Sequence, residues 1–222
     1  WFTERITEFI GDDKDLLEKC IPTFPPAGKR MLVDNGTWLK ALKRDNVHLI
    51  TDPIRRITEA GFETEKGDSL NVDVLIYATG FYPSRILWPM EIRGLGGIDL
   101  QKHWAGDPHA YKGVSIPSFP NFFCMYGPNT NIVVNGSIIF FSECEMRYIL
   151  GCIKLLIENG HKAMDVRQNV HDAYNEWIDE GNRNMAWGAP DVRSWYKNEK
   201  GRVTQNWPFT MTSFHCLQMT RV

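Results

Sequence analysis

The 222-residue sequence has no pair of cysteines in a CxxC arrangement, and no histidine stands at the spacing of a zinc site. Its five cysteines are odd in number and scattered along the chain, which does not suit a disulfide framework. They are Cys20, Cys124, Cys144, Cys152 and Cys216. This pattern predicts a reduced, cytoplasmic protein whose cysteines are small buried apolar groups, and it predicts no metal site.

The sequence also lacks an excess of charge of either sign and lacks a long apolar run. The formal net charge is −2 and the pI is about 6.3, which gives no sign of a basic face for nucleic acid or an anionic membrane. No run approaches the roughly 18 apolar residues of a membrane span, and no signal-peptide pattern opens the chain. The chain is 43% hydrophobic, which is enough to form a core.

Several catalytic motifs are missing as well. The sequence contains no P-loop, no GxSxG nucleophile motif and no HExxH zinc motif. The glycine-rich run IRGLGGIDL, with Gly94, Gly96 and Gly97, lacks the third glycine of a dinucleotide fingerprint and does not precede a helical pattern. If the polypeptide performs chemistry, a cofactor must therefore carry the difficult step.

The stretch from Asn71 to Arg85 contains a clear succession of structural signals. Its apolar run Val74–Tyr77 predicts a strand buried on both faces, ended by the tight turn Ala78–Gly80. Gly80 would let the backbone turn sharply or approach a ligand closely. An ordinary core strand with an ordinary turn is the alternative interpretation.

The first part of the chain predicts helices over residues 1–20, broken at Gly11, with Asp12 or Asp13 as the cap of the second helix. Three prolines within five residues then predict a stiff loop that carries Lys29 and Arg30. A short helix follows residues 34–36, a strand is expected at 47–51, and two further strands with turns are expected over 54–70.

The second part predicts a short strand at 121–126, a turn-rich loop at 127–131 and a long helix. The helix begins at Ser137 or at Ser142, which has capping-box spacing to Glu145, and ends at Asn159-Gly160. Such an arrangement presents a helix N-terminus to an electron-rich group, although a plain turn is the alternative. Another helix is expected over 170–180, and an irregular, tryptophan-rich segment from residue 182 onward.

Four stretches of the chain form a distinctive combination through their order and spacing. They are FPPAGKRMLVDNGTWLKALKRDNVHLI (24–50), DVLIYATGFYPS (73–84), FPNFFCMYGPNTN with the following NGS and SECEMRYI (119–149), and RSWYKNEKGRVTQNWP (193–208). Together they resemble the C-terminal part of class B flavoprotein monooxygenases, specifically the Baeyer–Villiger monooxygenases, and within them the hydroxyacetophenone monooxygenase-like branch. The resemblance implies the C-terminal portion of an α/β flavoprotein with two dinucleotide-binding domains, FAD and NADPH, and antiparallel hairpin elements. Residues 1–77 would close the NADPH-binding domain, and residues 78–222 would complete the FAD-binding domain and add a C-terminal active-site segment.

In that family NADPH reduces the flavin, which captures oxygen as a C4a-peroxide that attacks a ketone and yields an ester. The resemblance places the active-site arginine at Arg30, and a permanently charged guanidinium suits the stabilisation of an oxyanion. A solvated surface charge is the alternative for Arg30 considered alone. A sulfide- or amine-oxygenating flavin enzyme is the nearest alternative activity, and a non-catalytic interaction or assembly module is the alternative of another class.

The resemblance also implies a set of cofactor-binding residues. These are Lys29, Thr79, Gly80, Asn129, Asn131, Asn135, Gly136, Ser137 and Trp195. The chain has Val133-Val134 where close relatives often carry Gly-His, which leaves the flavin contacts of this loop open. Because the sequence starts at Trp1 without an initiator methionine, we expect a piece of a longer protein that is inactive alone and prone to self-association. Its partner would be a small-molecule ketone, with no nucleic acid or membrane.

Overall fold

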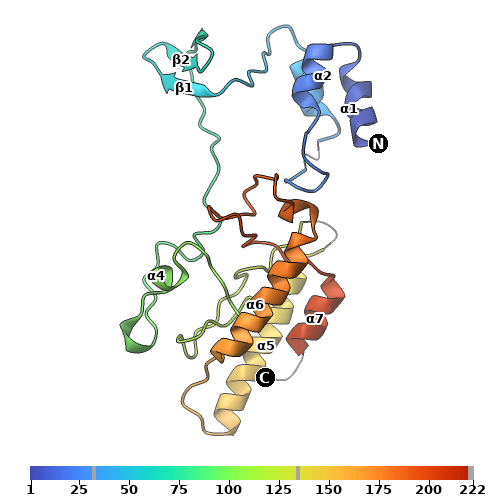
Figure 1. The fold of residues 1–222 in the computed structure, drawn as a ribbon. Helices are drawn as coiled ribbons and strands as arrows, with labels where there is room; N and C mark the ends of the chain where they lie inside the picture. The colour runs from blue at the N-terminus through green and yellow to red at the C-terminus, as the bar shows by residue number, and fades with distance from the viewer. Residues whose placement is uncertain (32–33, 134–135, 220–222) are drawn as a thin grey trace. The chain divides into compact units, whose positions relative to one another are not determined.

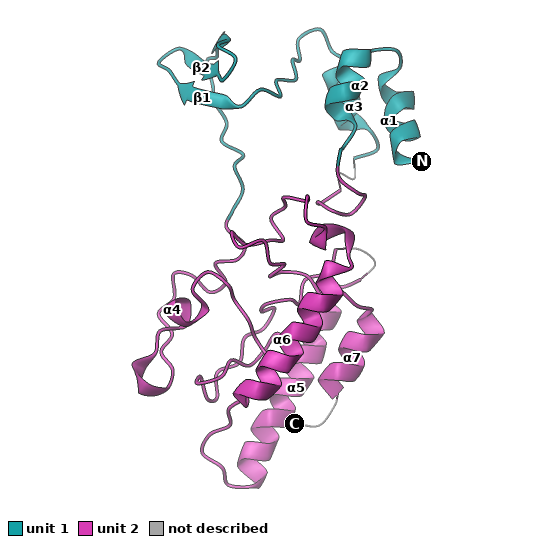
Figure 2. Ribbon diagram, viewed as in Figure 1, with its two compact units in different colours: residues 1–23, 32–81 teal, residues 24–31, 82–222 magenta. Residues whose placement is uncertain are grey.

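The computed structural model describes residues 1–31, 34–133 and 136–219, and these residues form two compact units (Figure 2). The first unit contains residues 1–23 and 32–81, and the second contains residues 24–31 and 82–222. The short segment 24–31 thus belongs to the second unit although the residues on either side of it belong to the first. This arrangement places Lys29 and Arg30 in the second unit.

The first unit begins with the two predicted helices, α1 (Phe2–Ile10) and α2 (Lys14–Cys20), followed by α3 (Thr37–Leu42). The predicted break at Gly11 is confirmed, since its φ of 81° lies in the left-handed region that favours glycine. α1 packs against both α2 and α3. A Cβ on Gly36, at the start of α3, would lie 2.7 Å from the ring of Phe9, so glycine allows this close approach.

Asp13 caps α2, because its carboxylate accepts a hydrogen bond of 3.0 Å from the amide of Leu16. We expect Asp13→Ala to lower the stability of this helix by about 1 kcal/mol, since one N-terminal amide loses its partner. Amide hydrogen exchange at Leu16 measures the effect. Asp12→Ala, at the exposed neighbouring position, is the matched control, and equal effects of both substitutions would contradict the assignment of the cap.

The first unit also contains a three-stranded antiparallel sheet in the order β1 (Ile54–Ile57), β2 (Gly61–Thr64), β3 (Ser69–Asn71). Arg56 and Glu63 form an ion pair across β1 and β2, with a hydrogen bond of 2.7 Å from Nε. The two strands expected within 54–70 are confirmed, and β3 is an additional strand. Since all pairings between the described strands are antiparallel, the α/β sheet implied by the resemblance is represented here only by its hairpin elements.

The prediction that residues 74–77 form a buried strand is wrong for this chain. Val74 and Ile76 have 74% and 83% of their surface exposed, and no described strand pairs with this extended segment. A strand covered on both faces requires neighbouring strands and covering helices, and the described residues supply neither. The apolar run of residues 74–77 therefore lacks the neighbouring strands and covering helices that its composition suits.

The strands expected at 47–51 and 121–126 are also not found among the described residues. Residues 47–51 are extended without a partner among the described strands. Residues 121–126 form turns, and the amide of Cys124 donates to the carbonyl of Val114 instead of joining a ladder. Short apolar runs fit a buried loop as well as a strand, because only pairing distinguishes the two.

The second unit is built around α5 (Ile138–Glu158), α6 (Gln168–Arg183) and α7 (Met211–Met219), which lie side by side in Figure 1. Its core joins all three helices through their buried side chains. The buried members are Phe141 and Cys144 of α5, Tyr174 and Ile178 of α6, Phe214 of α7, and Trp207. The rings of Phe141 and Phe214 stack at 3.9 Å between centroids, which fixes α7 against α5.

Local sequence signals predict the bounds of α5 and α6 to within a few residues. α5 starts after Ser137, whose hydroxyl accepts from the amide of Phe140 at 3.3 Å, so the earlier of the two predicted starts is the observed one. The helix ends at Asn159-Gly160 as predicted, and Gly160 has a φ of 65°. α6 extends the predicted 170–180 by a few residues at each end.

Four elements of the second unit were not predicted. They are η1 (Leu95–Gly97), α4 (Leu100–Trp104), η2 (Ala186–Gly188) and α7. The prediction of an irregular segment after residue 182 is therefore wrong for residues 211–219, where only Phe214 and Gln218 are buried and the amphipathic signal is weak. No described helix has the length and apolar character that crossing a membrane requires.

Candidate functional site

Arg30 lies on the segment 24–31, which packs on the loop after α6. Gly28 is buried there, and a Cβ on it would lie 3.4 Å from both the Ala186 carbonyl oxygen and a methyl group of Val192. Lys29 places its ammonium 4.6 Å from the centre of the Phe24 ring. Arg30 itself is exposed. The rigid loop predicted from the prolines is thus held by close backbone packing rather than by side-chain hydrogen bonds of Arg30 among the described residues.

Tyr126 is the side chain that connects Arg30 with the predicted flavin loop. Burial raises the pKa of the Tyr126 phenol, and the positive charge of Arg30 opposes this shift. The Tyr126 hydroxyl donates to Oδ1 of Asn131 at 2.7 Å, and Nδ2 of Asn131 donates to Oδ1 of Asn206 at 2.8 Å. The structure therefore brings Arg30 and Asn131 to one region through a tyrosine that was not predicted.

The backbone of Asn131 is paired with the segment that follows Arg202. Its amide donates to the carbonyl of Gln205 at 2.8 Å, and its carbonyl accepts from the amide of Trp207 at 2.7 Å. This is a short parallel bridge to Asn206. The loop and the C-terminal segment, far apart in the sequence, form one structural element at this point.

Asn129 is buried, with 1% of its surface exposed, and its φ of 60° lies in the left-handed region. Its Nδ2 donates to the carbonyls of Val203 and Asn206 at 2.8 and 3.2 Å, and its Oδ1 accepts from Arg202. Both polar atoms of the side chain are thus engaged inside the protein. The role of Asn129 as a cofactor-binding residue stays a prediction, and the geometry gives it a structural role.

Glu145 was predicted only as part of a capping box, and it has another role. It is fully buried on α5, and its Oε2 accepts from the amide of Tyr126 at 2.9 Å. Burial raises the pKa of the Glu145 carboxyl to about 7, while the Tyr126 amide and the Thr130 hydroxyl oppose the shift. A sequence signal was available, because Glu145 stands four residues from both Phe141 and Ile149 on the apolar face of the helix.

The remaining predicted residues are distributed over both units. Thr79 and Gly80 lie in the first unit and are exposed. The φ of Gly80 is 78°, and a Cβ added to it would meet no atom within 4 Å. Gly136 lies beside the core of the second unit, where a Cβ would approach Ile132 to 2.5 Å. Ser137 caps α5.

Two further predicted residues do not join this cluster. Trp195 is 45% exposed, and its closest aromatic neighbour is Tyr196, at 5.9 Å between ring centres. Asn135 lies outside the described residues. Of the predicted residues, Asn131 contacts Tyr126, Asn129 is bound to the C-terminal segment, and Arg30 acts electrostatically on Tyr126, whereas Thr79 and Gly80 belong to the other unit.

An apolar cavity of about 720 Å³ opens beside the loop, and Ile132 and Val133, directly after Asn131, form part of its wall. Four aromatic side chains from α6, η2 and the C-terminal segment also contribute to the wall, and they are Trp177, Trp187, Trp207 and Phe209. Cavities of this size and character suit small organic molecules. No group of three or more histidine, cysteine or acidic side chains that could hold a metal ion occurs in the described part of the chain.

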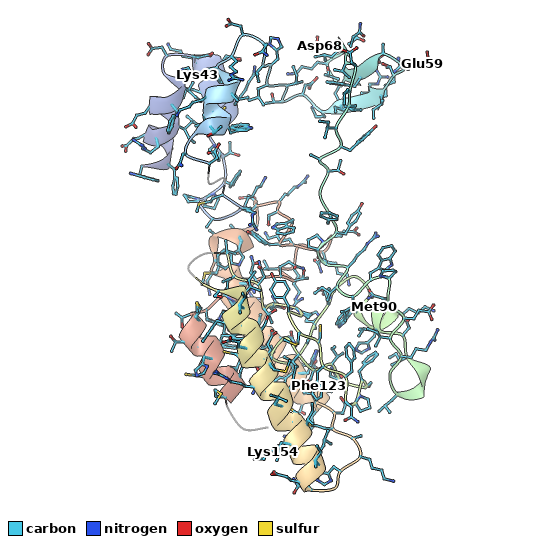
Figure 3. The ribbon with its side chains drawn as sticks, turned by 180° about the vertical axis from the view of Figure 1, so that it is seen from behind. Lys43, Glu59, Asp68, Met90, Phe123 and Lys154 are labelled. Carbon is cyan, nitrogen blue, oxygen red and sulfur yellow. The ribbon has the colours of Figure 1, made fainter. Side chains whose placement is uncertain are left out.

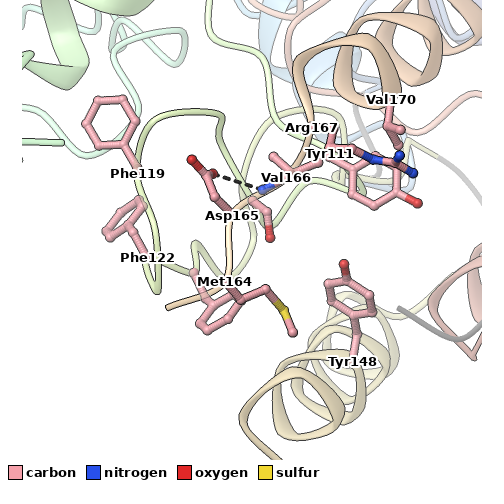
Figure 4. Close-up of a pocket in the computed structure, with 11 residues that line it drawn as sticks. Tyr111, Phe119, Phe122, Tyr148, Met164, Asp165, Val166, Arg167 and Val170 are labelled. Atoms are coloured by element: carbon pink, nitrogen blue, oxygen red, sulfur yellow. Dashed lines mark hydrogen bonds between the residues drawn. The ribbon is translucent and has the colours of Figure 1, made fainter. Parts of the chain in front are cut away.

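A second cavity, of about 300 Å³, lies on another part of the second unit (Figure 4). Tyr148 of α5 and Val170 of α6 contribute to its wall, together with Phe119 and Phe122 of the preceding loop. It contains none of the residues predicted for the site.

Comparison with known proteins identifies relatives along almost the whole chain, although no family model matches it. The chain is 33% identical over 209 residues to the FAD-binding monooxygenase ktnD of Aspergillus niger, covering 92% of this chain and 34% of the relative. It is 31% identical over 206 residues to a Baeyer–Villiger monooxygenase of Pseudomonas aeruginosa, covering 92% of this chain and 39% of the relative. The solved structure of oxidized steroid monooxygenase bound to NADP is 26% identical, with a TM-score of 0.82 over 97% of this chain and 41% of that one.

The chain is thus similar to one part of FAD-binding and Baeyer–Villiger monooxygenases. It spans roughly a third to two fifths of the length of these relatives. The likeness confirms the predicted resemblance at the level of flavoprotein monooxygenases. The hydroxyacetophenone branch, the division at residue 77 and the roles of the site residues stay predictions.

Proposed function

We propose that this chain is the C-terminal part of an FAD- and NADPH-dependent Baeyer–Villiger monooxygenase that inserts one oxygen atom of O2 next to a ketone carbonyl. The observation that carries the proposal is the structural match to a monooxygenase bound to NADP, with a TM-score of 0.82 over 97% of this chain. The 31% identity to a Baeyer–Villiger monooxygenase supports the reaction type. In this proposal residues 1–77 complete an NADPH-binding domain, residues 78–222 complete an FAD-binding domain, and the enzyme belongs to the hydroxyacetophenone branch.

In this proposal the residues of the chain suit the ring end of FAD, and not its phosphates. The 21-residue helix α5 starts at an exposed N-terminus directly after the loop, and the amides of such a terminus favour an electron-rich group. Ser137 and the loop of residues 127–133 would lie along the ring. The sequence has no glycine fingerprint for the phosphates, so that part of the cofactor would be held by residues outside this chain. When bound, FAD supplies the activation of oxygen.

Arg30 and the apolar cavity divide the remaining tasks in this proposal. The guanidinium of Arg30 would stabilise negative charge that develops on oxygen during the reaction. The 720 Å³ cavity, lined by Ile132, Trp177 and Trp207, would exclude water from the hydrocarbon part of the ketone. The polar group therefore comes from the loop 24–31, and the shape of the site comes from α6 and the C-terminal segment.

A second candidate function is a non-catalytic interaction module, and the exposed apolar residues favour it. On α5, which Figure 3 shows from behind with Lys154 labelled, Ile139 and Ile157 are 73% and 75% exposed. Phe81 in the first unit is 91% exposed. Surfaces of this kind mark contact with another protein part or self-association.

Flavin content separates the two candidates. We expect the isolated chain to purify colourless, because the phosphates of FAD would lack their binding loop. A chimera in which this chain replaces the matching segment of the Pseudomonas aeruginosa relative should retain the flavin absorption band and oxidise NADPH with formation of ester from a ketone. A folded chimera without flavin would contradict the proposed function and favour the interaction module. A flavin-loaded chimera that oxygenates only sulfides or amines would replace the ketone as the substrate class.

A further inference from the structure

Arg202 is a polar side chain of the second unit whose hydrogen bonds reach three separate segments. Its Nε donates to both carboxylate oxygens of Asp179 on α6 at 2.9 Å. Its Nη1 donates to the carbonyl of Pro108 at 3.0 Å and to Asp107 at 3.3 Å. Its Nη2 donates to Oδ1 of Asn129 at 3.1 Å. All the nitrogens of the guanidinium are therefore used.

These contacts determine how the Asn129 side chain is oriented. Because Oδ1 of Asn129 faces the guanidinium, Nδ2 points to the carbonyls of Val203 and Asn206, and both hydrogens of the amide have acceptors. The Asn129 backbone has a φ of 60°, which costs free energy for a residue with a side chain. The left-handed turn is thus maintained by the hydrogen bonds of the side chain, and Arg202 supplies the charged one.

The same arrangement continues to the predicted active-site arginine. The segment that follows Arg202 pairs with Asn131 through backbone hydrogen bonds of 2.8 and 2.7 Å. Asn131 accepts from the hydroxyl of Tyr126, whose phenol is within electrostatic reach of Arg30. Hydrogen bonds therefore link Arg202 and the segment after it to Asn129 and Asn131, and Asn131 to Tyr126.

We propose that Arg202 is a positioning residue of the site, which holds the loop of residues 126–131 against the C-terminal segment and thereby orients the Tyr126 hydroxyl through Asn131. Its catalytic meaning rests on the proposed function, whereas its effect on the loop does not. A lysine cannot replace it, because three donors on one nitrogen cannot reach Asp179, Pro108 and Asn129 at the same time. The side chain of Arg202 is 12% exposed, so solvent does not substitute for the lost contacts.

The substitution Arg202→Lys tests the proposal because it keeps the positive charge and removes the planar guanidinium with its donors on three nitrogens. We expect amide hydrogen exchange at Asn129 and Asn131 to accelerate about tenfold or more, since a hydrogen bond from a charged donor is lost. The apparent pKa of Tyr126 should also change as its contact with Asn131 loosens. Arg147→Lys, at an exposed position of α5, is the matched control and should leave both amides unchanged.

A merely structural role predicts a different outcome. In that case Arg202→Lys lowers the unfolding midpoint while exchange at Asn129 and Asn131 rises no more than at other amides of the unit, and the proposal is overturned. If Arg202→Lys does not fold, the milder Asp179→Asn, which weakens only the Nε contacts, should still accelerate both amides above the unit average.

In the flavin-loaded chimera Arg202→Lys should lower kcat for ester formation and leave KM for NADPH unchanged. If kcat is unaltered while hydrogen exchange at the Asn129 and Asn131 amides accelerates, Arg202 positions the loop but has no effect on catalysis. Because the exchange measurement needs no cofactor, failure of the proposed function and failure of this inference are distinguishable.

Discussion

Arg30→Ala should abolish ester formation in the flavin-loaded chimera while NADPH still reduces the flavin. The guanidinium is the fixed positive charge that we assign to the developing oxyanion, and removal of a single donor to such a charge typically lowers kcat by about 10²- to 10³-fold. Flavin reduction needs no such charge. Anaerobic bleaching of the flavin on addition of NADPH measures reduction, and product analysis under air measures oxygenation.

Two further variants test whether the charge or the planar geometry of Arg30 matters for ester formation. Arg30→Lys keeps the charge and loses the planar fork, so it should retain partial activity if charge dominates and little if the fork geometry dominates. Lys102→Ala removes an exposed cation of the second unit outside the predicted site and should leave ester formation close to the unsubstituted level. Ester formation by Arg30→Ala at the unsubstituted rate would exclude Arg30 as the catalytic arginine.

The helices could be predicted because their signals are local. Asp13 caps α2 and Ser137 caps α5 through hydrogen bonds that span only three residues, and Asn159-Gly160 ends α5 within its own last turn. Such signals are complete in the sequence itself, since the capping residue and the amide that it binds are near neighbours.

The strands failed for the opposite reason. Residues 74–77 have the composition of a buried strand, and the described residues provide no partner for them. Composition reports what surroundings a segment suits, whereas pairing depends on residues far away or outside the chain. The hairpin of β1 and β2 was predictable because its partner strands follow each other directly.

The site shows the same division. Arg30 was predicted from a family resemblance, and Tyr126, Asn206 and Arg202 were not predicted. The side-chain hydrogen bonds that join the loop to the C-terminal segment connect residues more than 70 positions apart, such as the bonds from Arg202 to Asn129 and from Asn131 to Asn206. No spacing rule relates such positions, so only the fold shows that they meet.

Glu145 is the exception, because a charged residue on the apolar face of a helix is visible in the sequence, and its burial has a measurable consequence. Burial raises the pKa of its carboxyl from 4.5 to about 7 in the folded protein. Between these two values the folded state binds more protons than the unfolded state, so the free energy of unfolding must fall as the pH rises. The full shift corresponds to a loss of roughly 3 kcal/mol by pH 8.

Glu145→Gln should remove this pH dependence. Glutamine has nearly the same shape, its carbonyl oxygen can still accept from the amide of Tyr126, and it carries no charge that burial opposes. We therefore expect the variant to be more stable than the unsubstituted chain at pH 8 by up to roughly 3 kcal/mol and similar to it near pH 4.5. Urea unfolding followed by tryptophan fluorescence at both pH values measures the difference.

Glu143→Gln, at an exposed position one residue before Cys144, is the matched control and should follow the unsubstituted chain at both pH values. Since Oε2 of Glu145 accepts a hydrogen bond from the amide of Tyr126, a Glu145→Gln variant with unchanged pH dependence would contradict the burial of the Glu145 carboxyl beside this loop.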